Sequence, residues 1–342
     1  MRPKATALLK GPVPVELRER IVRQIREFDM NLRSTSTSLY IDTPIAETEF
    51  KFEPTSLRVN VSAINQAMLH QARESASYML EYLWPDCLSE MKWSGDANPD
   101  RTPPNFQLAT VRSSRRLSEN FQRVTLSCSD LALLQVGGMH FTLILPPPGE
   151  IPRWPTLNEY GRTQWPTDED ALHRAAYTFV AFDESTSCFD FDVFLHAGGR
   201  VPEWATTVSS GQEVGVMGPG GGDFPETPFL LAGGDETALP AIRRILEQAP
   251  PEQLGAVYLE TGFGTNRQEV QAPDGVSVHW LERGTGSSLV DELEAFQLPE
   301  DDASSFVWIA AEQQAVRRLK KHFRNKGLSG QRSYFAIYWT AQ

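Results

Sequence analysis

Cysteine is scarce in this sequence. The three cysteines, Cys87, Cys128 and Cys188, lie far apart among 342 residues and form no C-x-x-C pair. Neither a disulfide framework nor a cysteine-ligated iron–sulfur cluster is therefore expected, since such a cluster usually takes four thiolates. We interpret the cysteines as reduced thiols of a cytoplasmic protein.

Long apolar runs are also missing. No stretch approaches the roughly 18 residues that a membrane span requires, and the beginning of the sequence lacks the apolar core of a signal peptide. The sequence therefore predicts no membrane insertion.

Positive charge is in deficit, with 32 Lys and Arg against 44 Asp and Glu and a formal net charge of −12. This balance argues against a nucleic-acid partner and against a surface for anionic membranes. Metal ligation is not expected either, because five of the six histidines lack the spacing of a metal site, namely His70, His140, His173, His279 and His322.

The chain is long enough for several domains, and 40% hydrophobic residues suffice for several cores. Residues 1–100 predict a small α+β domain of unknown role. Its helix patterns lie at 15–28, with Ile21, Ile25 and Phe28 on one face, and at 65–84, and its strand patterns lie at 38–44, 47–54 and 56–63. A segment rich in Gly, Pro, Asp and Asn, from 93 to 105, is typical of a linker.

The middle of the chain changes to closely spaced strands, which predict a six-stranded antiparallel Greek-key β-barrel over 105–224. The six candidates lie at 106–116, 120–129, 139–146, 175–183, 188–197 and 212–218. From 225 to 342, strand patterns alternate with helix patterns, which predicts an α/β parallel-sheet domain that binds a nucleotide. A barrel packed at the carboxyl ends of such a sheet leaves a cleft where two flat cofactors could meet.

The sharpest local motif is AGGDETALPAI, from Ala232 to Ile242, which follows an apolar strand and opens a helix. Two glycines permit a tight turn, and the amides of a helix N-terminus suit a phosphate. The acidic residues and threonine that follow are also ordinary capping residues. A phosphate site and a well-capped helix are therefore equally open interpretations.

This motif and several others occur in the order found in one protein family. The other strings are SENFQRVTLSCSDL, GGMHFTLILP, FDVFLHAGG, VGVMGPGGG and VWIAAEQQAVRRLKKHF. Over about residues 106–339 the sequence resembles the siderophore-interacting proteins, which are flavin-dependent ferric-siderophore reductases of ferredoxin-reductase-like fold. The resemblance implies FAD as cofactor, NADH or NADPH as electron donor and a ferric siderophore as substrate, with release of Fe(II) and no catalytic side chain. The N-terminal domain resembles a small domain sometimes fused ahead of such reductases.

The resemblance also implies a flavin site. In the family, an Arg-x-Tyr-Ser/Thr motif places the tyrosine on the isoalloxazine, the hydroxyl near its reactive nitrogen and the arginine on a phosphate. Tyr177 and Thr178 match this motif, but Ala175 occupies the arginine position and Arg174 lies one residue earlier. Adjacent strand residues face opposite sides, so Arg174 can serve only if a β-bulge re-aims it. Simple packing of Tyr177 in the barrel is the alternative.

Further site residues are implied in the same way. At the flavin pyrophosphate the family pattern places His196, Gly198, Trp204 and Ala205. On the NAD(P)H side it places Gly234, Asp235, Glu236, Thr237 and Glu312. Because ferric siderophores are often anionic, we expect positive side chains near the cleft, and the candidates are Arg153, Arg162 and Arg332.

Two alternatives to the reductase stay open. The protein could be a non-catalytic binding protein for a siderophore or another small molecule, with a degraded flavin site, or a flavin reductase with a different electron acceptor. The choice between NADH and NADPH, the siderophore type and the oligomeric state also stay open at this point.

Overall fold

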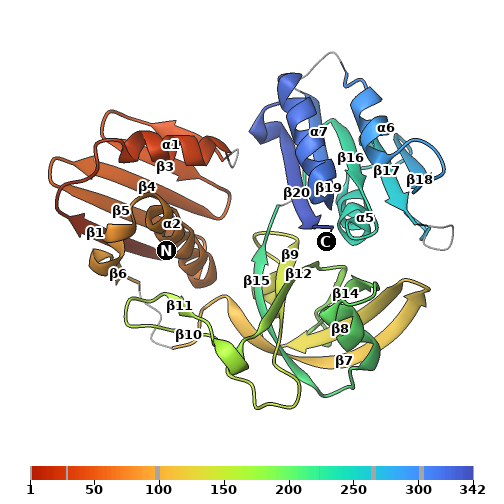
Figure 1. Cartoon of the computed structure of the whole chain (residues 1–342), viewed down its shortest axis with the longest axis horizontal. Coiled ribbons are helices and arrows are strands. Elements are labelled where there is room, and N and C mark those ends of the chain that lie inside the picture. Colours follow the sequence, from red (N-terminus) through yellow and green to blue (C-terminus); the bar gives the residue numbers. More distant parts are fainter. Residues whose placement is uncertain are drawn as a thin grey trace.

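Three large β-sheets follow one another along the described chain, each in its own unit, and a two-stranded hairpin accompanies the second (Figure 1). The computed structural model describes residues 2–27, 30–96, 101–222, 224–262, 267–299 and 304–341. We call 2–96 the N-terminal unit, 101–222 the central unit and 224–341 the C-terminal unit. In this described part, no helix has both the length and the apolar character needed to cross a membrane.

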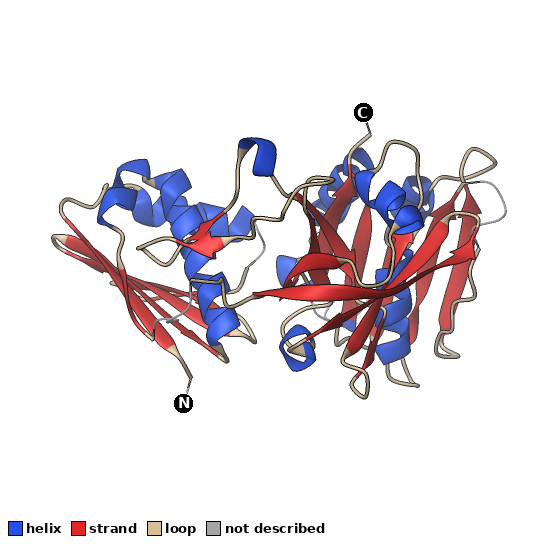
Figure 2. Ribbon diagram, turned by 90° about the horizontal axis from the view of Figure 1, so that it is seen from below, coloured by secondary structure: helices blue, strands red, loops and turns tan. Residues whose placement is uncertain are grey.

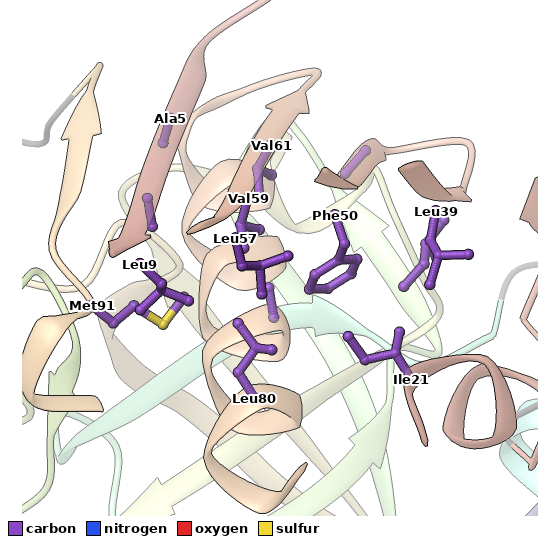
Figure 3. Close-up of a cluster of buried hydrophobic side chains, with 14 of the residues drawn as sticks. Ala5, Leu9, Ile21, Leu39, Phe50, Leu57, Val59, Val61, Leu80 and Met91 are labelled. Carbon is purple, nitrogen blue, oxygen red and sulfur yellow. The ribbon is translucent and has the colours of Figure 1, made fainter. Parts of the chain in front are cut away.

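The N-terminal unit is an antiparallel sheet with two helices on one face (Figure 2). Its elements are β1 (Lys4–Lys10), α1 (Leu17–Glu27), β2 (Leu32–Ser34), β3 (Ser38–Asp42), β4 (Ala46–Glu53), β5 (Ser56–Ala63), α2 (Gln66–Leu83), a 3-10 turn (Pro85–Glu90) and β6 (Trp93–Gly95). The strand order is β2-β3-β4-β5-β1-β6. Ile21 of α1 and Leu80 of α2 meet Phe50, Leu57 and Val59 of the sheet in one buried cluster (Figure 3).

The expected helices and strands of this unit are confirmed, apart from Phe28, which lies outside the described residues. The expected linker is wrong at its start, because β6 pairs with β1 there, Trp93 opposite Ala7. A strand of three residues is too short to show an alternation of apolar and polar residues in the sequence. This segment is a strand because it pairs with the free edge of β1.

The central unit is an antiparallel sheet in the order β12-β9-β15-β7-β8-β14-β13. Its strands are β7 (Phe106–Ser118), β8 (Phe121–Cys128), β9 (His140–Leu145), β12 (His173–Thr178), β13 (Ala181–Asp183), β14 (Cys188–Phe194) and β15 (Glu213–Gly220), joined by the helices α3 (Leu131–Leu134) and α4 (Arg200–Thr207). All six strand candidates are confirmed, and one of them divides into β12 and β13. The Greek-key closure of the barrel stays a prediction.

The long connection before β12 carries a small hairpin, β10 (Thr156–Leu157) and β11 (Thr163–Gln164), followed by a 3-10 turn (Asp168–Asp170). Helix α2 of the N-terminal unit docks against this hairpin. His70 Nε2 lies 3.0 Å from Thr163 Oγ1, and the Arg162 guanidinium donates to Glu81 at 3.0 Å.

The C-terminal unit is the predicted parallel sheet, in the order β18-β17-β16-β19-β20. Its elements are β16 (Phe229–Gly234), α5 (Leu239–Gln248), β17 (Leu254–Thr261), β18 (Val276–Glu282), α6 (Leu289–Ala295), β19 (Ser305–Glu312), α7 (Gln313–Asn325), a 3-10 turn (Gly330–Arg332) and β20 (Ser333–Trp339). The strand order reverses between β16 and β19, which is where ligands bind in open parallel sheets.

Apolar packing fixes the C-terminal unit against the central unit. Helix α5 covers one face of the parallel sheet, and its Leu239 and Ile242 share a buried cluster with Phe121 and Met139 of the central unit. Helices α6 and α7 cover the opposite face. The carboxyl ends of β16 and β19 are thereby held beside the antiparallel sheet.

The docking of α2 predicts a pH dependence of stability. Burial lowers the pKa of His70 to about 4, with a smaller contribution from Arg73, whereas an unfolded histidine titrates near about 6.5. As the pH falls, His70 is therefore protonated in the unfolded chain before it is protonated in the folded protein. The free energy of unfolding is unaffected by this group above about pH 6.5 and decreases, by up to about 3 kcal/mol, as the pH falls to about 4. His70→Gln removes the titration and should flatten the pH dependence of the free energy of unfolding.

Urea unfolding at pH 7 and pH 4.5 measures this effect. The matched control is His279→Gln, at an exposed histidine, which should behave as the wild type. An unaltered pH dependence in His70→Gln would contradict the prediction.

Candidate functional site

A cavity of about 600 Å³ lies where the three units meet. Its walls come from β9, β12, β14 and β15 of the central unit, from β20 and the loop after β16 of the C-terminal unit, and from Gln71 of α2. A volume of this size is within the range of about 300–1,000 Å³ typical of cofactor sites.

Tyr177 forms part of the cavity wall and also packs on the barrel core. Its ring centroid lies 5.2 Å from that of Phe191 and 6.4 Å from that of Phe141. Burial raises the pKa of the Tyr177 phenol, which therefore stays neutral at pH 7. The ring thus presents a fixed aromatic surface to the cavity. Packing of Tyr177 in the barrel and contact with a ligand are compatible, because they use different sides of the side chain.

A hydrogen-bonded chain connects two units at the cavity. His140 Nδ1 lies 3.1 Å from Thr178 Oγ1, and its Nε2 lies 3.2 Å from the Tyr338 hydroxyl. Burial lowers the pKa of His140 to about 4, so the imidazole is neutral at pH 7 and one nitrogen donates while the other accepts. The hydroxyl of Thr178 is therefore oriented by a defined partner.

The floor of the cavity is nearly free of side chains. Gly218, Pro219, Gly220 and Gly221 line it, and a Cβ on Gly221 would lie 2.2 Å from His140 Cδ2. The residues Gly218 to Gly221 of the string VGVMGPGGG therefore line the cavity with few side chains, and at Gly221 only glycine fits.

Two buried acceptors in the cavity wall lack partners within the described residues, Gln71 Oε1 and Asn105 Oδ1. Buried polar atoms are normally hydrogen-bonded, and an unsatisfied one costs about 1–3 kcal/mol. Both oxygens are buried, so they are unsatisfied acceptors behind the surface of the cavity wall.

The loop after β16 places its two acidic side chains in different environments. Asp235 accepts from Thr237 N at 2.9 Å, Thr237 Oγ1 at 2.5 Å and Trp339 Nε1 at 2.7 Å. Burial raises the pKa of Asp235, and these hydrogen bonds oppose that shift. Asp235 therefore holds the loop to β20, while Glu236 and Thr237 line the cavity.

Glu236 is only 4% exposed and needs a counter-charge. Arg283 donates to both of its carboxylate oxygens, at 3.2 and 2.8 Å, and to Glu260 at 3.1 Å. Burial opposes the charge of Arg283, but the hydrogen bonds and charges of the two glutamates raise its pKa overall. The carboxyl ends of β16, β17 and β18 are thus cross-linked by one guanidinium.

Gly234 is required where the loop leaves β16. A Cβ at this position would lie 2.4 Å from Ala238 Cβ and 2.7 Å from Ala310 O. The glycine therefore serves the packing of the turn on β19, and it is not among the residues that line the cavity.

Arg174 and Ala175, three and two residues before Tyr177, lie on opposite faces of β12. The ladder between β12 and β9 has a regular register without a bulge, so Arg174 faces away from the Tyr177 side of the strand. The guanidinium carbon of Arg174 lies 4.3 Å from the ring centroid of Trp165. Ala175, at the position of the family arginine, faces the cavity beside Tyr177.

Of the residues expected at a pyrophosphate, only His196 lines the cavity. It is exposed, and its Nδ1 lies 3.2 Å from Ala197 O. Gly198 has a φ of +72° in the turn before α4. Trp204 and Ala205 pack on the core of the central unit and thereby attach α4 to it.

The remaining expected residues take part in structural contacts. Glu312 caps α7, with its Oε2 accepting from Gln314 N at 2.5 Å. Arg153 pairs with Asp170 at 3.1 Å, and Arg162 pairs with Glu81 across the units. Arg332 ends the 3-10 turn before β20. In the described part of the chain, no arginine or lysine lines the cavity.

The sequence reasoning missed several residues that form the cavity. Tyr338 and Gln71 line it outside the strings quoted above, and His140 and Asp192 lie within GGMHFTLILP and FDVFLHAGG but were given no site role. Asp192 is 4% exposed and is paired with Arg123 at 2.7 and 2.9 Å. The two aspartates in FDFDVF, Asp190 and Asp192, were the available signal, because a charged residue in an apolar strand needs a partner.

The cavity suits a flat aromatic group rather than a metal ion. In the described residues, no three His, Cys, Asp or Glu side chains gather to hold a metal. The aromatic ring of Tyr177 and the glycine-rich segment from Gly218 to Gly221 line the cavity, and this lining suits a planar ring. The phosphates of such a cofactor would depend on His196 and backbone amides.

Two family models match consecutive parts of the chain. The siderophore-interacting FAD-binding domain matches residues 110–223, and the siderophore-interacting protein model matches residues 227–342. The N-terminal unit lies outside both matched ranges.

Individual relatives agree with these matches. The chain is 31% identical over 251 residues to the NADPH-dependent ferric-chelate reductase of Escherichia coli, covering 71% of this chain and 96% of that protein. It is 27% identical over 232 residues to the ferric vibriobactin reductase of Vibrio cholerae, covering 65% and 85%. The crystal structure of the siderophore-interacting protein SipS from Aeromonas hydrophila superposes with a TM-score of 0.57 at 25% identity, covering 71% of this chain and 100% of that chain.

The buried ion pair between Arg283 and Glu236 predicts that two similar Arg→Met substitutions will lower the free energy of unfolding by different amounts. Arg283→Met leaves the carboxylate of Glu236 buried without its counter-charge, so the free energy of unfolding should fall by about 1–3 kcal/mol. The matched control is Arg318→Met, which removes an equally bidentate contact to Glu294, at 2.8 and 2.7 Å, on the exposed surface. Urea denaturation should give a much smaller loss for the control, and equal losses would contradict the prediction.

Proposed function

This chain belongs to the siderophore-interacting protein family, and we propose that it is a flavin-dependent ferric-siderophore reductase that takes electrons from NAD(P)H. The observation that carries the proposal is the cavity beside Tyr177 and Thr178, at the point where the parallel sheet reverses its strand order. Residues 105–224 would form the flavin-binding domain and residues 225–342 the NAD(P)H-binding domain.

FAD would be held by groups that already surround the cavity. Tyr177 offers its aromatic face, Thr178 its hydroxyl, and Gly218 to Gly221 a floor against which a ring can lie. The pyrophosphate would meet His196 and the amides at Gly198. The chemistry that FAD supplies when bound is to accept a hydride from the nicotinamide and to deliver single electrons to Fe(III).

The protein itself would orient the hydroxyl of Thr178 and compensate the charge of Glu236. His140, neutral at pH 7, holds the Thr178 hydroxyl at 3.1 Å. Arg283 neutralises Glu236, so the NAD(P)H phosphates would not face a bare carboxylate at the sheet edge. Fe(II) binds the hard oxygen ligands of a siderophore less tightly than Fe(III) does, so reduction would release the metal.

One observation favours the alternative of a binding protein without turnover. Ala175 stands where the family has its phosphate arginine. A chain with too little affinity for flavin would still retain the cavity. Copurification of flavin, seen in the absorption spectrum of the purified protein, separates the two functions.

The first test concerns flavin binding. Tyr177→Ala should weaken FAD binding by about tenfold, because the aromatic contact is lost, whereas Tyr177→Phe keeps the ring and should bind as the wild type does. Fluorescence titration with FAD measures the dissociation constants, and the melting temperature shows that both variants are folded. Equal affinity in Tyr177→Ala and the wild type would rule out the stacking role.

The electron acceptor requires a second measurement on the same protein. Stopped-flow oxidation of the NAD(P)H-reduced protein by a ferric siderophore should be faster than oxidation by a quinone. Faster oxidation by the quinone would overturn the proposed substrate and favour a flavin reductase with another acceptor.

The alanine at the family's arginine position predicts a gain of function. Ala175 faces the cavity next to Tyr177, so Ala175→Arg should place a guanidinium at the flavin phosphates and tighten FAD binding about tenfold through charge-assisted hydrogen bonds. The control Ala181→Arg adds the same charge at an exposed position of β13. If both variants bind FAD equally, the phosphate does not lie near Ala175.

A further inference from the structure

A second hollow lies mainly in the N-terminal unit, which the family models do not cover. A cleft of about 210 Å³ lies between strands β3 and β4 and helix α2. Its walls are largely apolar and include three methionines, with Met30, Met68, Met79, Ile41, Ile45 and Phe50 as the main contributors. Methionine side chains are flexible and polarisable, so they adapt to apolar ligands of different shape.

The cleft is open to solvent on one side and carries no charge. Thr43 and Ser75 line it and are exposed. None of the described residues that line the cleft is an acid, an arginine, a lysine or a histidine. A ligand in the cleft would therefore be held by burial of apolar surface.

The cleft adjoins the central cavity. Gln71, Gly220 and Gly221 line both hollows. Gln71 Nε2 donates to Pro219 O at 3.4 Å, and Gln71 Oε1 is the unpartnered acceptor described above. The two hollows are thus divided by the side-chain amide of Gln71 and by the backbone of Gly220 and Gly221.

The central unit also closes the end of the cleft. Gly137, in the loop before β9, lines the cleft, and a Cβ there would lie 3.0 Å from Met68 Sδ. This close contact, together with the α2 docking at His70 and Arg162, fixes the cleft next to the central cavity. A ligand whose arm passes beside Gln71 would therefore contact both hollows.

We infer that the cleft binds the apolar arm of a ferric chelate whose metal centre lies in the central cavity. The substrate class would be iron chelators that carry a short alkyl or aromatic arm. The identity of the iron-bearing head group rests on the proposed reductase function, whereas the preference for an apolar arm rests on the lining of the cleft.

A pair of chelates with one head group tests this inference. Equilibrium dialysis of the full chain, with iron measured in each compartment, compares ferric octanohydroxamate with ferric acetohydroxamate. The octanoyl arm should improve the affinity of the wild-type protein by about tenfold, because burial of a few methylene groups suffices for that gain. Similar affinities for the two chelates, or no binding of either, would overturn the inference.

Substitutions in the cleft locate the effect. Ala72→Leu fills the cleft from α2, and Met79→Gln makes its wall polar, so each should bring the ratio of the two affinities close to one. The matched control Ala295→Leu adds the same bulk at an exposed position of α6 and should keep the wild-type ratio. A wild-type ratio in both cleft variants, with melting temperatures showing that they are folded, would overturn the inference.

The outcome is separable from that of the proposed function. If the octanoyl preference depends on Ala72 and Met79 but neither chelate is reduced in the presence of NAD(P)H and FAD, the cleft stands and the reductase proposal fails. If both chelates are reduced with equal affinity, the reductase stands and the inference about the cleft fails.

Discussion

The close approach of backbones at the end of β15 is the constraint on which the rest of the site depends. A Cβ on Gly138 would lie 2.3 Å from Gly220 O, and a Cβ on Gly222 would lie 2.8 Å from the ring of Tyr334. Only glycines allow β9, β15 and β20 to come this near to one another. This packing brings His140 and Tyr338 into contact and lets Gln71 of α2 reach the cavity. At this end of β15 the glycines leave out side chains that would otherwise occupy the junction of the three units.

Electrostatic balance is the second organising feature. Asp192, Asp235 and Glu236 are each at most 4% exposed, and unpaired charges at such depth would cost several kcal/mol each. Each has its own partner: Arg123 for Asp192, Trp339 for Asp235 and Arg283 for Glu236. The two buried carboxylates that line the cavity, those of Asp192 and Glu236, are thus each paired with an arginine, whereas Asp235 is held by neutral donors.

Much of the fold followed from local pattern, and so did part of the site. Period-two alternation and the helical apolar stripes identified most of the longer strands and helices, because these patterns report which face of an element is buried. The strands β1, β2, β10 and β11 were not expected. The short strand β6 escaped, since its pairing with the free edge of β1 leaves no periodic signal. Tyr177, Thr178, Glu236 and Thr237 were expected at the site and line the cavity, although their roles toward FAD and NAD(P)H remain predictions.

The sequence by itself determined the order of the sheets, their antiparallel or parallel character and the loops at which ligands could bind, because hydrophobic period and glycine placement are local properties. The tertiary structure alone decided which side chains meet. His140 and Tyr338 are 198 residues apart, and Gln71 reaches Pro219 across 148 residues. Such contacts depend on how the units dock, which is set by packing of surfaces that no single stretch of sequence contains. For the same reason Arg162 pairs with Glu81 at a unit interface rather than entering the cavity.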